Sequence, residues 1–188
     1  MSTTITQRIQ ADANDGFSNS NGVYSTSTIL VGRNASHHIY DSWFLFKPLI
    51  PKRSGIVSAT LTLVVKDTET ENMTWRIYMN DVDDAAAPTT QADHASKTRT
   101  TAYTAWSKTS PWTAEDVKVS PDFATPLQEV IDRSGYDIDS NIMVLLDDAG
   151  SYDDAVRFYD YYVDSAKAAL LSVEYLLPPM GILIATRR

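Results

Sequence analysis

Three side chains with oxygen atoms lie close together near the start of the sequence, where they could bind a cation. Asp12, Asn14 and Asp15 lie within four consecutive residues, and calcium prefers several carboxylate and amide oxygens as ligands. The spacing differs from that of an EF-hand loop, because Val23 stands where that loop requires glutamate. The sequence therefore predicts no obligatory cofactor, and Asp12, Asn14 and Asp15 are the candidate ligands of a calcium ion.

Carboxylates further along the chain could serve a glycan hydrolase, which needs two of them at a working separation. The candidates are Asp81, Asp83, Asp84, Asp147, Asp148, Asp153 and Asp154. No spacing singles out a pair, and Asp is frequent in turns because its side chain bonds the nearby backbone. The three histidines fit no zinc motif, and the sequence contains no nucleophile elbow or nucleotide-binding loop. We therefore predict that the chain is not an enzyme.

Exposed aromatic rings are the side chains on which sugars stack. Trp112 follows a Lys-Thr-Ser-Pro loop, and Tyr162 lies in the tyrosine-rich segment 159–162. These two are the candidate glycan-binding residues. The alternative is that tryptophans such as Trp75 and Trp106 fill a hydrophobic core, because their burial removes much apolar area from water.

An apolar strip follows Pro178 and Pro179 at the end of the sequence. Its candidate partner-binding residues are Met180, Ile182, Leu183, Ile184, Arg187 and Arg188. The strip is too short to cross a bilayer, which takes about 18 or more apolar residues. It either folds back as an edge strand on its own sheet or adds a strand to a neighbouring subunit, for which an extended apolar segment is well suited.

Composition and charge limit the function further. The 188 residues include no cysteine, and their formal net charge is −8. Because nucleic-acid binding requires clustered Lys and Arg, this charge argues against a nucleic-acid partner. The first ten residues lack the basic and apolar regions of an export signal, and no segment is apolar enough to predict a membrane span. We expect one domain over 1–177, followed by an extended arm over 178–188.

Most of the chain shows the patterns of β-strands, and these strands must position the candidate side chains. The clearest lies at 56–66, where every second residue is apolar: Val57, Ala59, Leu61, Leu63 and Val65. Further strands are predicted at 4–9, 27–31, 43–46, 74–79, 101–106, 141–146, 156–161 and 170–176. Short strands separated by turn-forming residues favour an all-β, antiparallel sandwich of the jelly-roll type over an α/β fold.

One helix is predicted at 121–134. Ser120 is its expected N-cap, Pro121 suits the first turn, and Gly135 is expected just after the last residue. Four apolar residues fall on one face at helical spacing: Phe123, Leu127, Val130 and Ile131. We expect this face to pack on the core and the helix to close one open end of the sandwich.

The order of several segments resembles a known domain family. These segments are 11–17, 57–63, 77–78, 81–86, 104–106, 120–122, 127–136, 141–144 and 166–175. Together they resemble a jelly-roll sandwich domain, similar to carbohydrate-binding modules, that occurs in structural proteins of tailed bacteriophages and in secreted bacterial proteins. The chain departs from the family pattern at 137–140, where Asp-Ile-Asp-Ser replaces a glycine-rich turn. The resemblance implies a β-sandwich and offers no catalytic motif to transfer.

Within this family, the sequence context favours a phage virion protein. A secreted module would normally follow an export signal, whereas this sequence starts at Met1 without one. We expect synthesis in the host cytoplasm and a place in the virion, as a capsid decoration protein that binds the shell and sister subunits. Closed symmetry is common in such assemblies, so we expect a homo-oligomer, by analogy a trimer. The alternatives are a carbohydrate-binding or host-adhesion module of a tail or head fibre, and a tail or neck structural protein.

Overall fold

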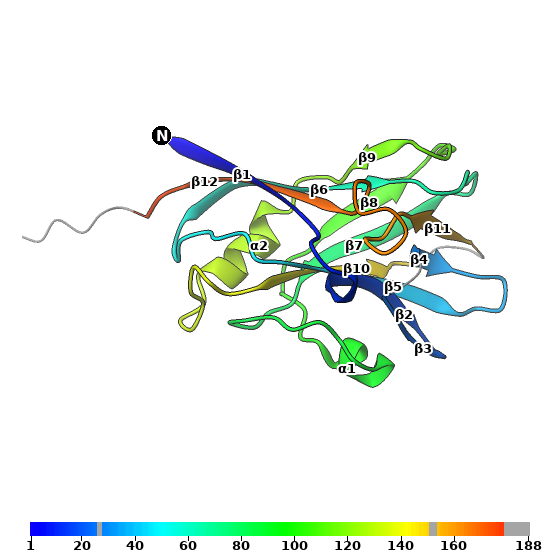
Figure 1. Cartoon of the computed structure of the whole chain (residues 1–188), viewed down its shortest axis with the longest axis horizontal. Coiled ribbons are helices and arrows are strands. Elements are labelled where there is room, and N and C mark those ends of the chain that lie inside the picture. Colours follow the sequence, from blue (N-terminus) through cyan, green and yellow to red (C-terminus); the bar gives the residue numbers. More distant parts are fainter. Residues whose placement is uncertain (26–27, 151–153, 179–188) are drawn as a thin grey trace, which may run out of the picture.

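Two antiparallel sheets form the molecule in the computed structural model, which describes residues 1–25, 28–150 and 154–178. The smaller sheet has four strands in the order β1 (Ser2–Arg8), β12 (Leu170–Leu176), β6 (Gly55–Val64) and β9 (Val117–Val119). The main path of the eight-stranded sheet runs through β11 (Ala155–Phe158), β4 (Ile29–Arg33), β5 (Ile39–Phe46), β10 (Ile142–Asp148), β7 (Met73–Met79) and β8 (Thr104–Lys108). Its other two strands are β2 (Asp15–Asn19), which pairs with β5, and β3 (Gly22–Tyr24), which pairs with β2. The two sheets form separate layers (Figure 1), which confirms the predicted all-β sandwich.

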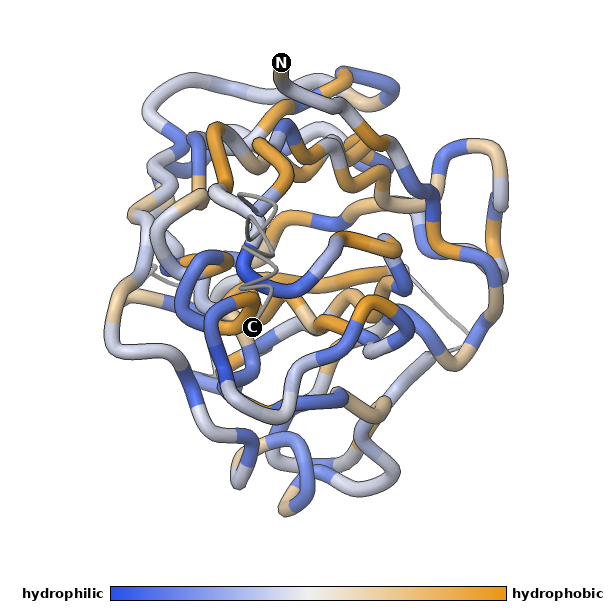
Figure 2. The backbone as a smooth tube through the Cα atoms, turned by 90° about the vertical axis from the view of Figure 1, so that its left-hand side faces the viewer, coloured by the Kyte–Doolittle hydropathy of each residue, from blue (hydrophilic) through white to orange (hydrophobic). Residues whose placement is uncertain are grey.

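The inner faces of the two sheets meet in one hydrophobic core. Along β6, Ala59, Leu61 and Leu63 are buried, as their period-two spacing predicts. Val57, nearer the start of this strand, is instead 46% exposed. Trp75 fills the same core from β7. Figure 2 shows hydrophobic stretches gathered in the middle of the molecule, with many hydrophilic loops around them.

A second apolar cluster lies on the other face of the larger sheet. Trp43 on β5 and Met143 on β10 belong to it, because neighbouring residues of a strand face opposite sides of the sheet. The segment that includes helix α1 (Gln91–Ser96) covers this cluster, with Ala85 buried against it and the His94 ring 5.2 Å from that of Trp43. Strands β5 and β10 are therefore buried on both faces, which explains their nearly continuous apolar sequences.

The predicted helix at 121–134 is shorter than expected, because α2 spans Ala124–Ile131 and Phe123 is its N-cap residue. Hydrogen bonds to β6 hold the preceding residues in place. Ser120 Oγ accepts from the Leu61 amide at 2.9 Å, and Asp122 Oδ1 accepts from the Ala59 amide at 2.8 Å. Among the described residues, neither helix is long and apolar enough to cross a membrane. The apolar face of α2 is buried as predicted, through Phe123, Leu127, Val130 and Ile131.

Other local predictions also need correction. The strand predicted at 156–161 ends at Phe158, because the chain turns where Asp160 Oδ1 accepts from the Val163 amide. Gly135 is not in the left-handed conformation typical of a glycine after a helix; a Cβ there would lie 2.0 Å from Asp83 Oδ2, so the Asp83 side chain would have to move. Of the strand predicted at 27–31, residue 27 lies outside the described ranges. Short elements that the sequence patterns did not predict are η1 (Asp12–Asn14), β2, β3, β9 and α1.

A substitution at Gly16 tests how closely the strands pack around β2. A Cβ there would lie 2.4 Å from the Tyr24 carbonyl oxygen and 2.5 Å from the Trp43 ring. We expect Gly16→Ala to lower the free energy of unfolding by about 1–3 kcal/mol, the usual cost of overpacking. Gly55→Ala is the control, because the nearest atom to its Cβ would be 4.0 Å away. Urea unfolding followed by circular dichroism compares the two, and equal stability would show that the strands relax around residue 16.

Candidate functional site

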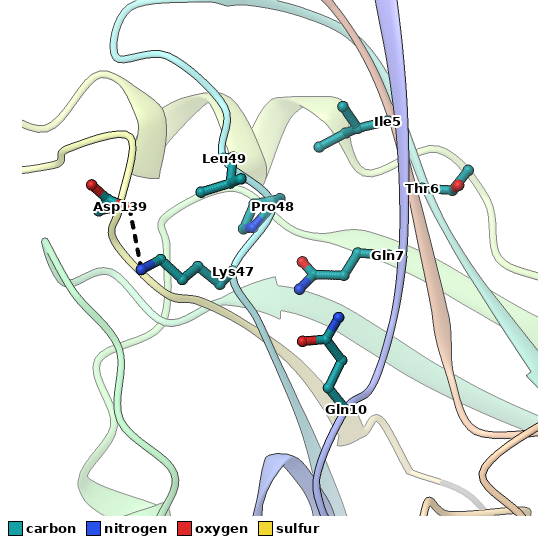
Figure 3. A pocket seen from close by; sticks show the side chains of 8 residues that line it. All are labelled: Ile5, Thr6, Gln7, Gln10, Lys47, Pro48, Leu49 and Asp139. Atoms are coloured by element: carbon teal, nitrogen blue, oxygen red, sulfur yellow. Dashed lines mark ion pairs between the residues drawn. The ribbon is translucent and has the colours of Figure 1, made fainter.

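A groove with a cavity volume of about 640 Å³ lies between strand β1 and the segment that follows β5. This volume is in the range that protein pockets for small ligands have. Figure 3 shows its side chains on the ribbons that form its walls. The lining comes from three parts of the chain that are distant in sequence: Ile5, Thr6, Gln7 and Gln10; Lys47, Pro48 and Leu49; and Asp139.

Strand β1 forms one wall of the groove through the alternation of its side chains. Ile5 and Gln7 point across the groove toward the segment that carries Pro48, whereas Thr6 points away from it (Figure 3). Ile5 is half-buried and packs against the main core. Strand β1 pairs with β12 along its whole length, from Ser2 opposite Leu176 to Arg8 opposite Leu170. This pairing holds one wall of the groove in place.

The other long edge of β1 is open. Within the part of the chain that the structure describes, β1 pairs only with β12. The Ile9 amide donates to the Ala169 carbonyl at 3.0 Å, which continues the register of the β1–β12 pair. Because antiparallel pairing uses every second residue, the backbone N–H and C=O groups of Thr4, Thr6 and Arg8 point to the open edge. This edge lies beside the groove.

The opposite wall is the chain that leaves β5. Pro48 follows the end of the strand and cannot donate to a sheet. Leu49 then adopts a left-handed φ of 56°, and its side chain is 52% exposed. The next residue, Ile50, is fully buried, and its carbonyl oxygen accepts from the Tyr136 hydroxyl at 3.0 Å. The wall is therefore anchored in the core while it presents an apolar side chain beside the groove.

Polar groups line the middle and one end of the groove. The Gln7 Oε1 atom is buried and has no hydrogen-bond partner among the described residues. An unpaired buried amide oxygen costs about 1–3 kcal/mol, so an incoming N–H donor would stabilise this position. Gln10 extends toward Gln7 in Figure 3, and Lys47 Nζ lies 3.2 Å from Asp139 Oδ1 at one end. The groove thus combines apolar surface with a buried acceptor.

A second groove, with a cavity volume of about 320 Å³, lies around β2 and the start of β5. Its lining is mainly polar, which suits a ligand with many hydroxyl groups. Burial and the neighbouring Asp147 raise the pKa of Asp41, one of its lining residues, to about 6. The lining residues are Ser18, Asn19, Ser20, His37, His38, Ile39, Asp41 and Gln91.

The candidate calcium ligands lie where η1 meets β2. Asp12 and Asn14 belong to η1, whereas Asp15 begins β2, is fully buried and accepts from the Tyr161 amide at 3.1 Å. Burial, and then the nearby Asp160 carboxylate, raise the pKa of Asp15 to about 8, and a protonated carboxyl group is a poor calcium ligand. Among the described residues, no three His, Cys, Asp or Glu side chains are grouped to hold a metal ion. Calcium binding stays a prediction.

The two candidate glycan-binding residues lie in different environments. Trp112 is only 7% exposed, so the expectation of an exposed ring there is wrong. Its ring lies 5.8 Å from that of Trp75 and 5.9 Å from that of Trp106, and it belongs to the main core. The aromatic residues of this region cluster because burying their rings together stabilises the sandwich. Tyr162 is 61% exposed, in the turn after β11.

Several carboxylates considered for catalysis form ion pairs. Asp81 and Asp83 both bind the Arg133 guanidinium group, at 2.5 and 2.7 Å. Asp147 pairs with an arginine at 2.9 Å. These contacts join loops to neighbouring elements, which is a structural role. Asp153 lies outside the described residues.

The C-terminal strip follows strand β12 in the sequence. Its candidate partner-binding residues lie outside the described residues: Met180, Ile182, Leu183, Ile184, Arg187 and Arg188. Strand β12 ends at Leu176, which pairs with Ser2 at the start of β1. Strand β12 therefore ends at the end of its sheet where β1 begins (Figure 1).

Sequence reasoning did not find the groove. The strands predicted at 4–9 and 43–46 are present as parts of β1 and β5, but no local pattern relates them. Ile5 and Leu49 line one groove because β1 and β5 belong to opposite sheets, a relation that forms only when the sheets pack.

No protein-family model matches this sequence, and no curated protein matches it.

Proposed function

We propose that this chain is a virion structural protein of a tailed bacteriophage, specifically a capsid decoration protein that binds the shell and sister subunits. The resemblance of segments such as 127–136 and 166–175 to the phage-associated jelly-roll domain supports this assignment. One structural observation carries the assembly role: an open strand edge on β1 lies beside a groove lined by Ile5 and Leu49. Such edges pair readily with another polypeptide.

Binding fits the site better than chemistry does. The groove combines half-buried Ile5 and exposed Leu49 with the amides of Gln7 and Gln10, a surface suited to peptide backbone and apolar side chains. The ionisable groups in its lining, Lys47 and Asp139, bind each other. We propose that the protein acts without a cofactor and without catalysis.

The proposal is tested by mixing the purified chain with capsid shells of the phage that encodes it and imaging the particles by electron microscopy. The intact chain and a chain truncated after Pro178 are compared. Regular added density with the intact chain is the expected result, and its loss on truncation would place the shell contact in residues 179–188. Bare shells with the intact chain would overturn the decoration role. Density added to the tail or neck when whole phage particles are imaged in the same way would instead support those structural roles.

A glycan-binding or host-adhesion role is the second candidate. The observation in its favour is the mainly polar groove around Ser18, His38 and Asp41. Binding on a glycan array that Asp41→Asn weakens, with Tyr162→Ala as a comparison outside this groove, would support it. An array without signal would leave the assembly role as the better assignment.

A further inference from the structure

We infer that the open edge of β1 and the adjoining groove receive residues 180–186 of a second copy of this chain as an added strand. The inference rests on the proposed assembly function and names the site through which sister subunits bind. Four features carry it: the exposed edge, the lining of the groove, the sequence of the arriving segment and the direction in which the chain leaves β12.

From Ser2 to Gln7, the edge of β1 lacks the features that normally prevent strand addition. Natural edge strands are protected by Lys, Pro, a bulge or a covering loop. The segment from Ser2 to Gln7 contains no charged residue and no proline, and its register with β12 runs without a shift. Thr4 and Thr6 direct their backbone N–H and C=O groups outward, so an arriving strand finds donors and acceptors at the spacing of a sheet.

The groove fits the side chains that an added strand would bring. Every second residue of such a strand would face the interior of the sandwich, where Ile5 and Gln7 point. Ile5 and Leu49 offer apolar surface, and the buried Gln7 Oε1 offers an acceptor that no described residue uses. A strand that buries apolar side chains here adds to the hydrophobic contacts of the core.

The segment 180–186 has the composition that this edge requires. Its seven residues match the seven of β1, an extended length of about 23 Å. Period-two spacing places Met180, Ile182 and Ile184 on one face, and the segment carries no charge. Arg187 and Arg188 follow it, which gives attraction toward a chain whose net charge is −8.

The direction of the chain favours a second copy over the same molecule. Strand β12 already occupies one edge of β1, so its own continuation would have to turn around the end of β1 to reach the other edge. Leu177 and Pro178 each precede a proline, and residues in that position are held in an extended conformation. A chain that stays extended at this point reaches an edge on a second copy more readily than the far edge of its own β1.

The experiment compares four proteins by sedimentation equilibrium: the intact chain, a chain truncated after Pro178, Thr6→Pro and Thr6→Val. Proline removes the outward N–H of Thr6 while the pairing through Ile5 and Gln7 remains, and valine keeps that N–H. The intact chain and Thr6→Val should form oligomers, and the truncated chain and Thr6→Pro should be monomers. A mixture of the two monomeric proteins should form a complex, because one supplies the arm and the other supplies the edge.

A synthetic peptide of residues 179–188 gives a second measurement. It should bind the truncated chain, and Thr6→Pro in that truncated chain should weaken the binding by roughly tenfold, equivalent to about 1.4 kcal/mol. Leu49→Glu in the groove wall should weaken it similarly. Circular dichroism checks that each variant is folded. If Thr6→Pro does not fold, the peptide affinity of Leu49→Glu serves as the test instead.

Three results would overturn the inference. An oligomer that survives truncation excludes the arm, and an oligomer lost on truncation but retained in both Thr6→Pro and Leu49→Glu excludes this edge. A monomeric intact chain whose truncated form binds the peptide would show that the arm folds back on its own sheet. Binding to capsid shells is measured in a separate experiment. If shells bind the protein as a monomer, the proposed function holds although this inference fails.

Discussion

Trp112→Ala should lower the free energy of unfolding by about 3–5 kcal/mol, because a large indole ring is removed from the core and a cavity is left. The ring is 7% exposed and lies near Trp75, Trp106 and Phe158. Urea unfolding followed by circular dichroism measures the effect without relying on tryptophan fluorescence, which the substitution itself changes.

Tyr162→Ala is the control for this prediction. Its side chain is 61% exposed, so we expect a change in stability within about 0.5 kcal/mol. Glycan binding measured on the same proteins distinguishes an aromatic residue that binds sugar from one that stabilises the core. A Trp112→Ala protein that keeps its stability and loses sugar binding would contradict the core position of this ring.

Asp15→Asn should remove a loss of stability that the unsubstituted protein shows as the pH rises. The folded protein holds the Asp15 proton up to a pKa of about 8, whereas the ordinary value of 3.8 applies when the chain is unfolded. The folded state therefore binds more protons between these values, and stability falls by up to about 1.4 kcal/mol for each pH unit within that window. Asparagine carries no charge and retains an oxygen that can accept from the Tyr161 amide.

The pH range from 6.5 to 8 isolates this effect. Burial, followed by the charges of Arg99 and Lys97, lowers the pKa of His94 to about 4 from an ordinary 6.5, so His94 adds stability that is lost as the pH falls through that interval. Asp41, whose pKa is about 6, acts in the same direction as Asp15 but mostly below this range. We expect the unsubstituted protein to lose about 2 kcal/mol between pH 6.5 and 8, and Asp15→Asn to lose much less.

Urea unfolding at several pH values, with and without calcium, tests the Asp15 prediction. Equal slopes for both proteins would mean that the Asp15 carboxylate is ionised in the fold at neutral pH. A rise in stability on adding calcium that Asp15→Asn abolishes would assign a cation to Asp12, Asn14 and Asp15. Burial of Asp15 and the nearby Asp160 carboxylate both favour the protonated form of its side chain.

Local sequence patterns predicted most of the strands. The alternation of β6 follows from residues that face the core at every second position, and the apolar face of α2 follows from helical spacing. The start of α2 could not be predicted, because Ser120, the expected N-cap, has two competing uses. As a cap it would start a helix, but its side chain binds the amide of Leu61 on a strand 59 residues away.

The sequence by itself determined the β-rich composition, the period-two strands and the apolar character of 180–186, since these depend on residue type and on neighbours along the chain. Only the tertiary structure decided which of these features became surfaces. Trp112 and Tyr162 were both candidates for exposed aromatic side chains, yet packing buried one and exposed the other. The groove beside β1 likewise exists because two sheets, formed by residues far apart in sequence, pack with one edge open. Burial and pairing of this kind are relations between distant segments, and no local pattern contains them.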